Sequence, residues 1–71
     1  MTYKYKCGKD IINVFVWSDD FHTDVAIYDS KAARSYERTI REDKDGKFSA
    51  GSINYLVYEK LKKYADIKIE E

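Results

Sequence analysis

The stretch Lys31-Ala-Ala-Arg34-Ser-Tyr-Glu-Arg38-Thr-Ile-Arg41 decides whether this chain combines helix with sheet, and it holds all three arginines of the sequence. At about 100° per residue, its four basic side chains share an arc of roughly 80°, and its apolar side chains share an arc of roughly 100° on the opposite side. The pattern predicts a helix with one apolar and one cationic face. As a strand over 35–42, the same residues would place Arg38 between Tyr36 and Ile40, so the helix is favoured.

Three segments before this helix have the patterns of β-strands. Residues 2–6 alternate aromatic and charged side chains, which predicts a half-buried strand at an edge of the sheet. Residues 11–17 are β-branched or aromatic on both faces, which predicts a central strand, and 23–28 predict a third. A second helix is expected from about Ser52, and 67–69 alternate again. The segments predict an α+β fold in a single domain, 1–71, with two helices packed on one face of an antiparallel sheet of three to four strands.

Turn, cap and core residues fit this order of elements. Gly8 and Gly46 supply positive φ at low cost in the turns 8–10 and 44–46, and Asp29 or Ser30 is expected to cap the first helix. Helical periodicity places Tyr64 on the inner face of the second helix. The residues expected to form the core are Ile12, Val14, Val16, Val25, Ile27, Leu56, Val57 and Leu61.

Length and composition exclude several classes of protein. Below about 70–80 residues, a single core seldom supplies more than roughly 3–5 kcal/mol, so strained catalytic geometry is hard to support. One cysteine among 71 residues excludes an intrachain disulfide framework. No run approaches the roughly 18 apolar residues of a membrane span, and the first residues lack the apolar segment of a signal peptide. A cytoplasmic, unprocessed chain is therefore expected.

Charges balance overall but are sorted along the chain. Thirteen basic and thirteen acidic residues give a net charge of zero, which argues against a DNA mimic and against a generic polycationic nucleic-acid binder. Residues 10–29 contain no lysine or arginine, whereas 31–41 contain Lys31 and all three arginines. The sequence leaves open whether the acidic and basic segments face and neutralise each other.

The basic face of the first helix is the strongest candidate binding surface, because the planar guanidinium fork suits phosphate and carboxylate groups. The plainer interpretation is a solvated helix face, in which Glu37 and Glu42 pair with nearby arginines. On the second helix, tyrosines cluster away from the core face, and tyrosine is enriched at interfaces. The expected partner-binding residues are Lys31, Arg34, Arg38, Arg41, Tyr55, Tyr58 and Lys62.

The loop Asp19-Asp20-Phe21-His22-Thr23-Asp24 gathers three carboxylates and the only histidine of the chain. Such a group can bind a metal or act as an acid–base pair, but no matching His or Cys set supports it elsewhere. No metal and no cofactor are therefore expected. The plainer interpretation is a hairpin loop in which Asp20 or Asp24 accepts backbone N–H bonds and Phe21 packs on the core. A second one is a partner-facing acidic loop of Asp19, Asp20 and Asp24.

Other patterns give weaker signals. Cys7 and His22 would form a nucleophilic pair only if two separate segments met. Asp43-Lys-Asp-Gly46 matches the middle of a calcium loop, but Arg41 and Ser52 stand where that loop needs carboxylates. Residues 3–6 interleave tyrosine with lysine, as single-strand binders do, without an RRM, KH or cold-shock signature. No catalytic residue is expected.

The sequence predicts a small non-enzymatic protein that acts through protein–protein contacts. In size and lack of motifs it is similar to the small accessory proteins of phages and mobile elements, which commonly bind and block or modulate a larger complex. The main alternative is nucleic-acid binding through the Arg/Lys helix face. A small metal-dependent or thiol enzyme is a remote alternative.

Overall fold

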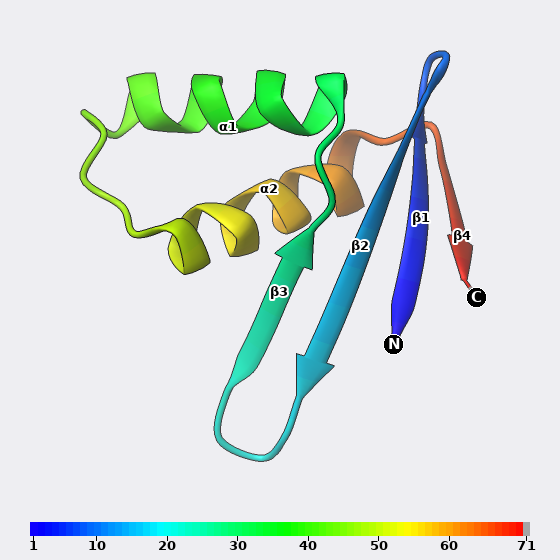
Figure 1. Cartoon of the computed structure of the whole chain (residues 1–71), viewed down its shortest axis with the longest axis horizontal. Helices are drawn as coiled ribbons and strands as arrows, with labels where there is room; N and C mark the ends of the chain where they lie inside the picture. The colour runs from blue at the N-terminus through cyan, green and yellow to red at the C-terminus, as the bar shows by residue number, and fades with distance from the viewer. Residues whose placement is uncertain (71) are drawn as a thin grey trace.

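The chain forms three strands, two helices and a fourth strand in the computed structural model, which describes residues 1–70 (Figure 1). The elements are β1 (Thr2–Cys7), β2 (Asp10–Ser18), β3 (Thr23–Ile27), α1 (Lys31–Asp43), α2 (Ala50–Tyr64) and β4 (Ile67–Glu70). All strand pairs are antiparallel, and the order in the sheet is β3-β2-β1-β4. The predicted α+β fold, with two helices packed on one face of the sheet, is therefore confirmed.

Strand β1 lies inside the sheet between β2 and β4, so its predicted position at an edge was wrong. Tyr5 pairs with Ile12 on one side and with Lys68 on the other, and only 1% of Tyr5 is exposed. The alternation in residues 2–6 correctly indicates one buried face. It cannot indicate that β4, at the far end of the chain, pairs with the second edge of β1.

Two aspartates connect the β1–β2 turn to the rest of the fold. Gly8, with φ of 61°, begins a two-residue hairpin loop that needs this conformation at its first position. Its N–H donates to Asp66 Oδ2 at 2.8 Å, in the connection between α2 and β4. Asp10 Oδ2 accepts from the N–H of Ala32 at 2.7 Å, in the first turn of α1. The turn, α1 and β4 are thereby joined at one end of the sheet.

Helix α1 forms as its periodicity predicts, and both of its ends are satisfied. Ser30 is the N-cap, and its Oγ accepts from the N–H of Ala33 at 3.0 Å. At the other end Asp45 and Gly46 both have positive φ, and the Gly46 N–H donates to the Arg41 carbonyl at 2.7 Å. The alternative strand over 35–42 is excluded.

Helix α2 begins at Ala50, two residues before the expected start, because Ser49 caps it. Three of the predicted core residues, Val16, Ile27 and Leu56, are half-buried and pack against the core, and Tyr64 at the last position of α2 is 58% exposed. The buried core consists of Tyr5, Ile12, Val14, Val25, Ala33, Ile40, Ile53, Val57 and Leu61.

Leu61→Ala is expected to destabilise the protein by about 2–5 kcal/mol, because Leu61 is fully buried and its removal leaves a cavity. In a chain of this size, that loss approaches the whole free energy of unfolding. Urea unfolding followed by circular dichroism measures it. A variant that melts within a few degrees of wild type would show that α2 does not pack through this face.

Tyr5→Phe is expected to leave the protein as stable or to stabilise it by about 1 kcal/mol. Among residues 1–70, the Tyr5 hydroxyl is the buried side-chain polar atom without a hydrogen-bond partner. Burial, and then the nearby Tyr58 and Tyr3, raise the pKa of Tyr5 to about 12. Below about pH 10, Tyr5 is neutral in both the folded and the unfolded chain. Between about pH 10 and 12 only the unfolded chain ionises Tyr5, so the wild type loses stability that the variant keeps.

Thermal unfolding of both proteins at neutral pH and near pH 10.5 measures this difference. A variant less stable than wild type at neutral pH, or one with the same alkaline loss, would contradict the assignment.

Candidate functional site

The face of the sheet opposite the helices carries several exposed apolar side chains. Successive side chains of a strand point to opposite faces, and the buried Ile12 and Val14 of β2 face the helices. Ile11, Phe15 and Trp17 therefore lie on the other face, where they are 52%, 39% and 45% exposed.

The neighbouring strands extend this surface on both sides. Paired residues share a face, so Ile67 of β4 lies beside Lys6 and Ile69 beside Lys4. Past the end of β3, Tyr28 donates its N–H to the Asn13 carbonyl at 3.0 Å, which places its side chain next to β2. We call the surface formed by these apolar residues the open face: Ile11, Phe15, Trp17, Tyr28, Ile67 and Ile69.

The open face is large for a chain of this size. Its six residues are each 39% to 57% exposed. Since an aromatic side chain has about 150–250 Å² of surface, their exposed area is on the order of 500 Å². The largest apolar patches of monomeric proteins reach about 300–600 Å² and are often functional. Sequence analysis missed this surface, because apolar residues on both faces of 11–17 were interpreted only as the sign of a central position in the sheet.

The predicted basic face of α1 is present, but each arginine has a carboxylate partner. Pairs of this kind contribute about 0–1 kcal/mol each at an exposed surface, and they reduce the local positive potential. The acidic loop does not neutralise these arginines, because it lies at the end of the sheet away from α1 (Figure 1). The pairs are Arg34–Asp29 at 3.2 Å, Arg38–Glu42 at 3.2 Å and Arg41–Glu37 at 3.0 Å.

The predicted tyrosine cluster on α2 is assembled, but it faces the core in part. Tyr58 is half-buried, with its ring edge-on to Tyr5 at 6.4 Å and to Tyr55 at 6.3 Å between centroids. The Lys62 ammonium lies 5.2 Å from the Tyr58 ring. Tyr55, 42% exposed, is the tyrosine of this pair that offers a contact surface.

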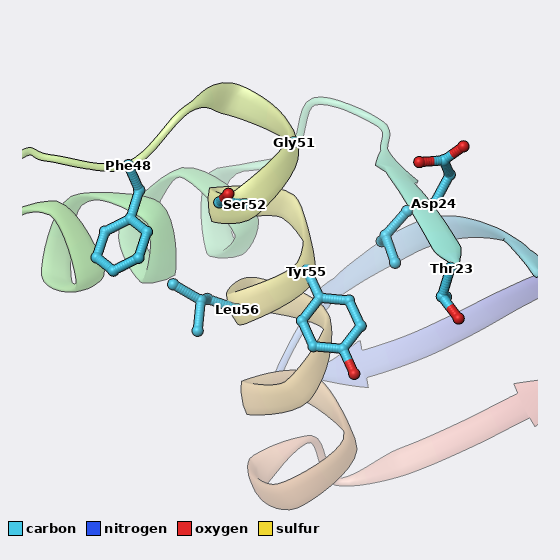
Figure 2. A pocket seen from close by; sticks show the side chains of 8 residues that line it. Thr23, Asp24, Phe48, Gly51, Ser52, Tyr55 and Leu56 are labelled. Carbon is cyan, nitrogen blue, oxygen red and sulfur yellow. The ribbon is translucent and has the colours of Figure 1, made fainter. Parts of the chain in front are cut away.

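Tyr55 also lines a hollow of about 370 Å³ where the first turns of α2 approach β3 (Figure 2). Phe48 and Leu56 form its apolar side, and Thr23 lies opposite them on β3. The Asp24 carboxylate is directed away from Tyr55 (Figure 2). The hollow therefore suits an apolar group better than acid–base chemistry.

The acidic loop is held by its first aspartate. Asp19 Oδ1 accepts from the N–H groups of Phe21 and His22 at 2.8 and 2.9 Å, and these bonds hold the pKa of Asp19 below its usual value. Asp20 and Asp24 were the predicted acceptors, but Asp19 follows β2 directly and so reaches the turn. Phe21 is 93% exposed and does not pack on the core, contrary to expectation.

The one histidine lies between two carboxylates of the same loop. His22 Nδ1 is 3.3 Å from Asp19, and His22 Nε2 is 3.3 Å from Asp24. No group of three or more His, Cys, Asp or Glu residues within 1–70 has an arrangement suited to a metal ion. Cys7 pairs with the start of β2, whereas His22 follows its end, so the two side chains are about 30 Å apart.

Cys7 instead lies near Tyr36 of α1, with 3.8 Å between the sulfur and the hydroxyl oxygen. Burial, and then the neighbouring thiol, raise the pKa of Tyr36. A raised phenol pKa keeps Tyr36 protonated and does not activate the thiol.

No protein-family model, no curated protein and no solved structure matches this chain. Neither helix that the structure describes is long and apolar enough to cross a membrane.

Reversing two arginine charges, Arg34→Glu with Arg38→Glu, is expected to leave the fold intact. Both side chains are exposed, and the change replaces two weak ion pairs by like charges at a cost of about 0.3–0.5 kcal/mol each. The melting temperature should fall by only a few degrees. Loss of cooperative melting would show that these arginines are structural.

Proposed function

We propose that this protein is a non-enzymatic binding domain, and that its open face docks on an apolar surface of another protein chain. The observation that carries the proposal is the presence of six exposed apolar residues on one face of the sheet, where Lys4 and Lys6 of β1 lie between those of β2 and those of β4. Burial of such a surface is the main source of free energy in protein association. The protein acts by occupying a surface of its partner, as a modulator or inhibitor does.

The composition of the open face supports a protein partner over a nucleic acid. Single-stranded nucleic acids bind sheets through aromatic rings that stack on bases, together with cations along the backbone. Phe15, Trp17 and Tyr28 are suited to stacking. The other half of the face consists of isoleucines, which cannot stack and which pack well against apolar protein side chains.

The distribution of charge supports the same choice. The arginines of α1 pair with neighbouring carboxylates, and the chain has no net charge to attract a polyanion. Lys6 lies between Ile11 and Ile67 on the open face, where it suits a single carboxylate of a protein partner. The basic face of α1 remains a proposed second contact surface.

Photo-crosslinking tests the proposed function. A photo-reactive phenylalanine analogue replaces Phe15 on the open face, and in a matched control it replaces Lys47, which is exposed between the two helices. After irradiation in a nuclease-treated lysate of the cells that encode the chain, we expect a discrete protein adduct at Phe15. Excess wild-type chain should suppress that adduct, and excess Phe15→Lys chain should not.

Equal yields at the two positions would contradict the proposal, as would an adduct that nuclease removes. A second measurement uses a mixed-sequence oligonucleotide. Tight binding at physiological salt, with log affinity falling by about 0.7–0.9 per phosphate contacted as log salt rises, would favour the nucleic-acid alternative.

A further inference from the structure

Strand β3 forms one edge of the sheet, so β2 pairs with only one of its sides. In an antiparallel pair, residues that exchange two backbone hydrogen bonds alternate with residues that exchange none. Past one end of the β2–β3 pair, the N–H of Tyr28 donates to the Asn13 carbonyl at 3.0 Å. Past the other end, in the same register, the N–H of Asp19 donates to the His22 carbonyl at 3.0 Å. Counted in twos from either bond, the residues of β3 that bond to β2 are Asp24 and Ala26.

The remaining residues of β3 direct their N–H and C=O groups away from β2, toward the free edge. Each offers one donor and one acceptor. Within residues 1–70, no hydrogen bond joins these groups to a helix, a loop or a side chain. A further strand beside β3 would therefore meet a row of unpaired backbone groups. The residues that form this row are Thr23, Val25 and Ile27.

The two edges of the sheet differ in their protection against a further strand. Proteins protect a sheet edge with short strands, charged side chains (above all lysine), proline or bulges. Strand β4 at the other edge has four residues, and two of them, Lys68 and Glu70, are charged. Strand β3 contains neither lysine nor proline, and its pairing with β2 runs unbroken over five residues. The β3 edge is therefore suited to accept a further strand.

A hollow of about 370 Å³ adjoins the β3 edge, between residues 23–25 and the first turns of α2 (Figure 2). Its apolar side consists of Phe48, Tyr55 and Leu56. A second hollow of about 240 Å³ lies next to Ile27 and is more polar, with Arg34 among its lining residues. Among the described strands, β3 alone lines either hollow. Both hollows therefore lie at this edge of the sheet, between the sheet and the helices.

We propose that the β3 edge binds an extended peptide segment of another protein as a fifth, antiparallel strand, with an apolar side chain of the peptide in the hollow beside Tyr55. The site is an edge of the sheet and not its open face, so the inference goes beyond the proposed function. Strand addition is a recurring mode of peptide recognition, in which backbone hydrogen bonds give affinity and pockets for alternate side chains give specificity. The unpaired row of β3 supplies the first, and the hollows supply the second.

Pairing with β3 determines which side chains the peptide needs. Residues opposite each other in a sheet share a face. The peptide residue opposite Val25 faces the helices, because the side chain of Val25 is buried against them, and it reaches the apolar side of the hollow. The next peptide residue lies opposite Asp24, whose side chain is 73% exposed. Since opposite charges stabilise such cross-strand pairs, the edge fits an apolar residue followed by a basic one.

A second copy of the chain does not fit the same edge. Antiparallel pairing of two β3 edges requires a two-fold axis normal to the sheet, which leaves the helices of both copies on the same face. The first turns of α2 lie on the side of β3 that is away from β2 (Figure 1). Those of the two copies would therefore meet over the joined edges. A single peptide strand brings no helices, and its side chain has the hollow to itself.

The probe is the peptide acetyl-Ser-Thr-Val-Leu-Lys-Thr-Ser-amide, in which leucine is expected opposite Val25 and lysine opposite Asp24. Titration into isotope-labelled protein, followed by NMR, should give saturable shift changes that are largest at the amides of Thr23, Val25 and Ile27. Hydrogen exchange of these amides should slow in the complex. No saturable change there up to about 5 mM peptide would overturn the inference. Changes confined to Phe15 and Trp17 would place the peptide on the open face and would also overturn it.

N-methylation of the peptide tests the backbone bonds without altering the protein. The leucine N–H should point to β3 and the lysine N–H away from it, because bonded residues alternate along the strand. N-methyl leucine should therefore weaken binding by about tenfold or more, whereas N-methyl lysine, the matched control, should change it by less than about twofold. Equal losses for the two peptides would contradict strand addition.

Substitutions in the protein test the two side-chain contacts. Tyr55→Ala should weaken binding by about fivefold, and Tyr64→Ala, at the exposed far end of the same helix, should not. Asp24→Lys should weaken binding by about threefold, and a peptide with glutamate in place of lysine should restore it. Asp43→Lys is the matched control for charge, since Asp43 is exposed at the end of α1.

Thermal unfolding of each variant verifies that it is folded. Wild-type affinity in Tyr55→Ala would overturn the placement of the apolar side chain, and a loss in Asp43→Lys equal to that in Asp24→Lys would overturn the register. Protection of the Val25 amide that rises with protein concentration, in the absence of peptide, would show a second copy at this edge and overturn the inference.

Discussion

A sheet has two faces, and the helices of this chain cover one of them. Tyr5 and Ile12 at the centre of the sheet, and Leu61 on α2, are almost completely buried in the single layer of core that results. Both helices that the structure describes in residues 1–70 contribute buried residues to that layer. The opposite face therefore remains exposed, with an apolar surface that a stable monomer has no reason to keep.

The connections at one end of the sheet hold this arrangement. Asp10 binds the first turn of α1 and Asp66 binds the β1–β2 turn, so both helices are fixed relative to the central hairpin. The other end, where β2 and β3 project as a hairpin, carries the acidic loop and the exposed Phe21 (Figure 1). One end of the fold is thus constrained by hydrogen bonds between distant segments, and the other presents polar and aromatic groups to solvent.

Charge and apolar surface have different consequences for binding. The arginines of α1 are conspicuous in the sequence, yet two pair with a glutamate four residues away and Arg34 pairs with Asp29, just before the N-cap. Such pairs contribute little to stability, and they reduce the positive potential that could attract a partner. The open face has no comparable local compensation, because an exposed isoleucine can lose contact with water only against another surface. For this reason we place the proposed binding surface on the sheet and not on helix α1.

The sequence by itself determined the local elements. Periodicity in 31–41 and in the second half of the chain specified two helices, and alternation specified the strands, because these patterns depend on neighbours within about four residues. Ser30 as cap and the turns at Gly8 and Gly46 followed from the same local rules. Only the tertiary structure decided that β4 pairs with β1, which buries Tyr5, and that one face of β2 stays uncovered. Both depend on pairing between distant segments, and the pattern of a single strand cannot encode which of its faces another element will reach.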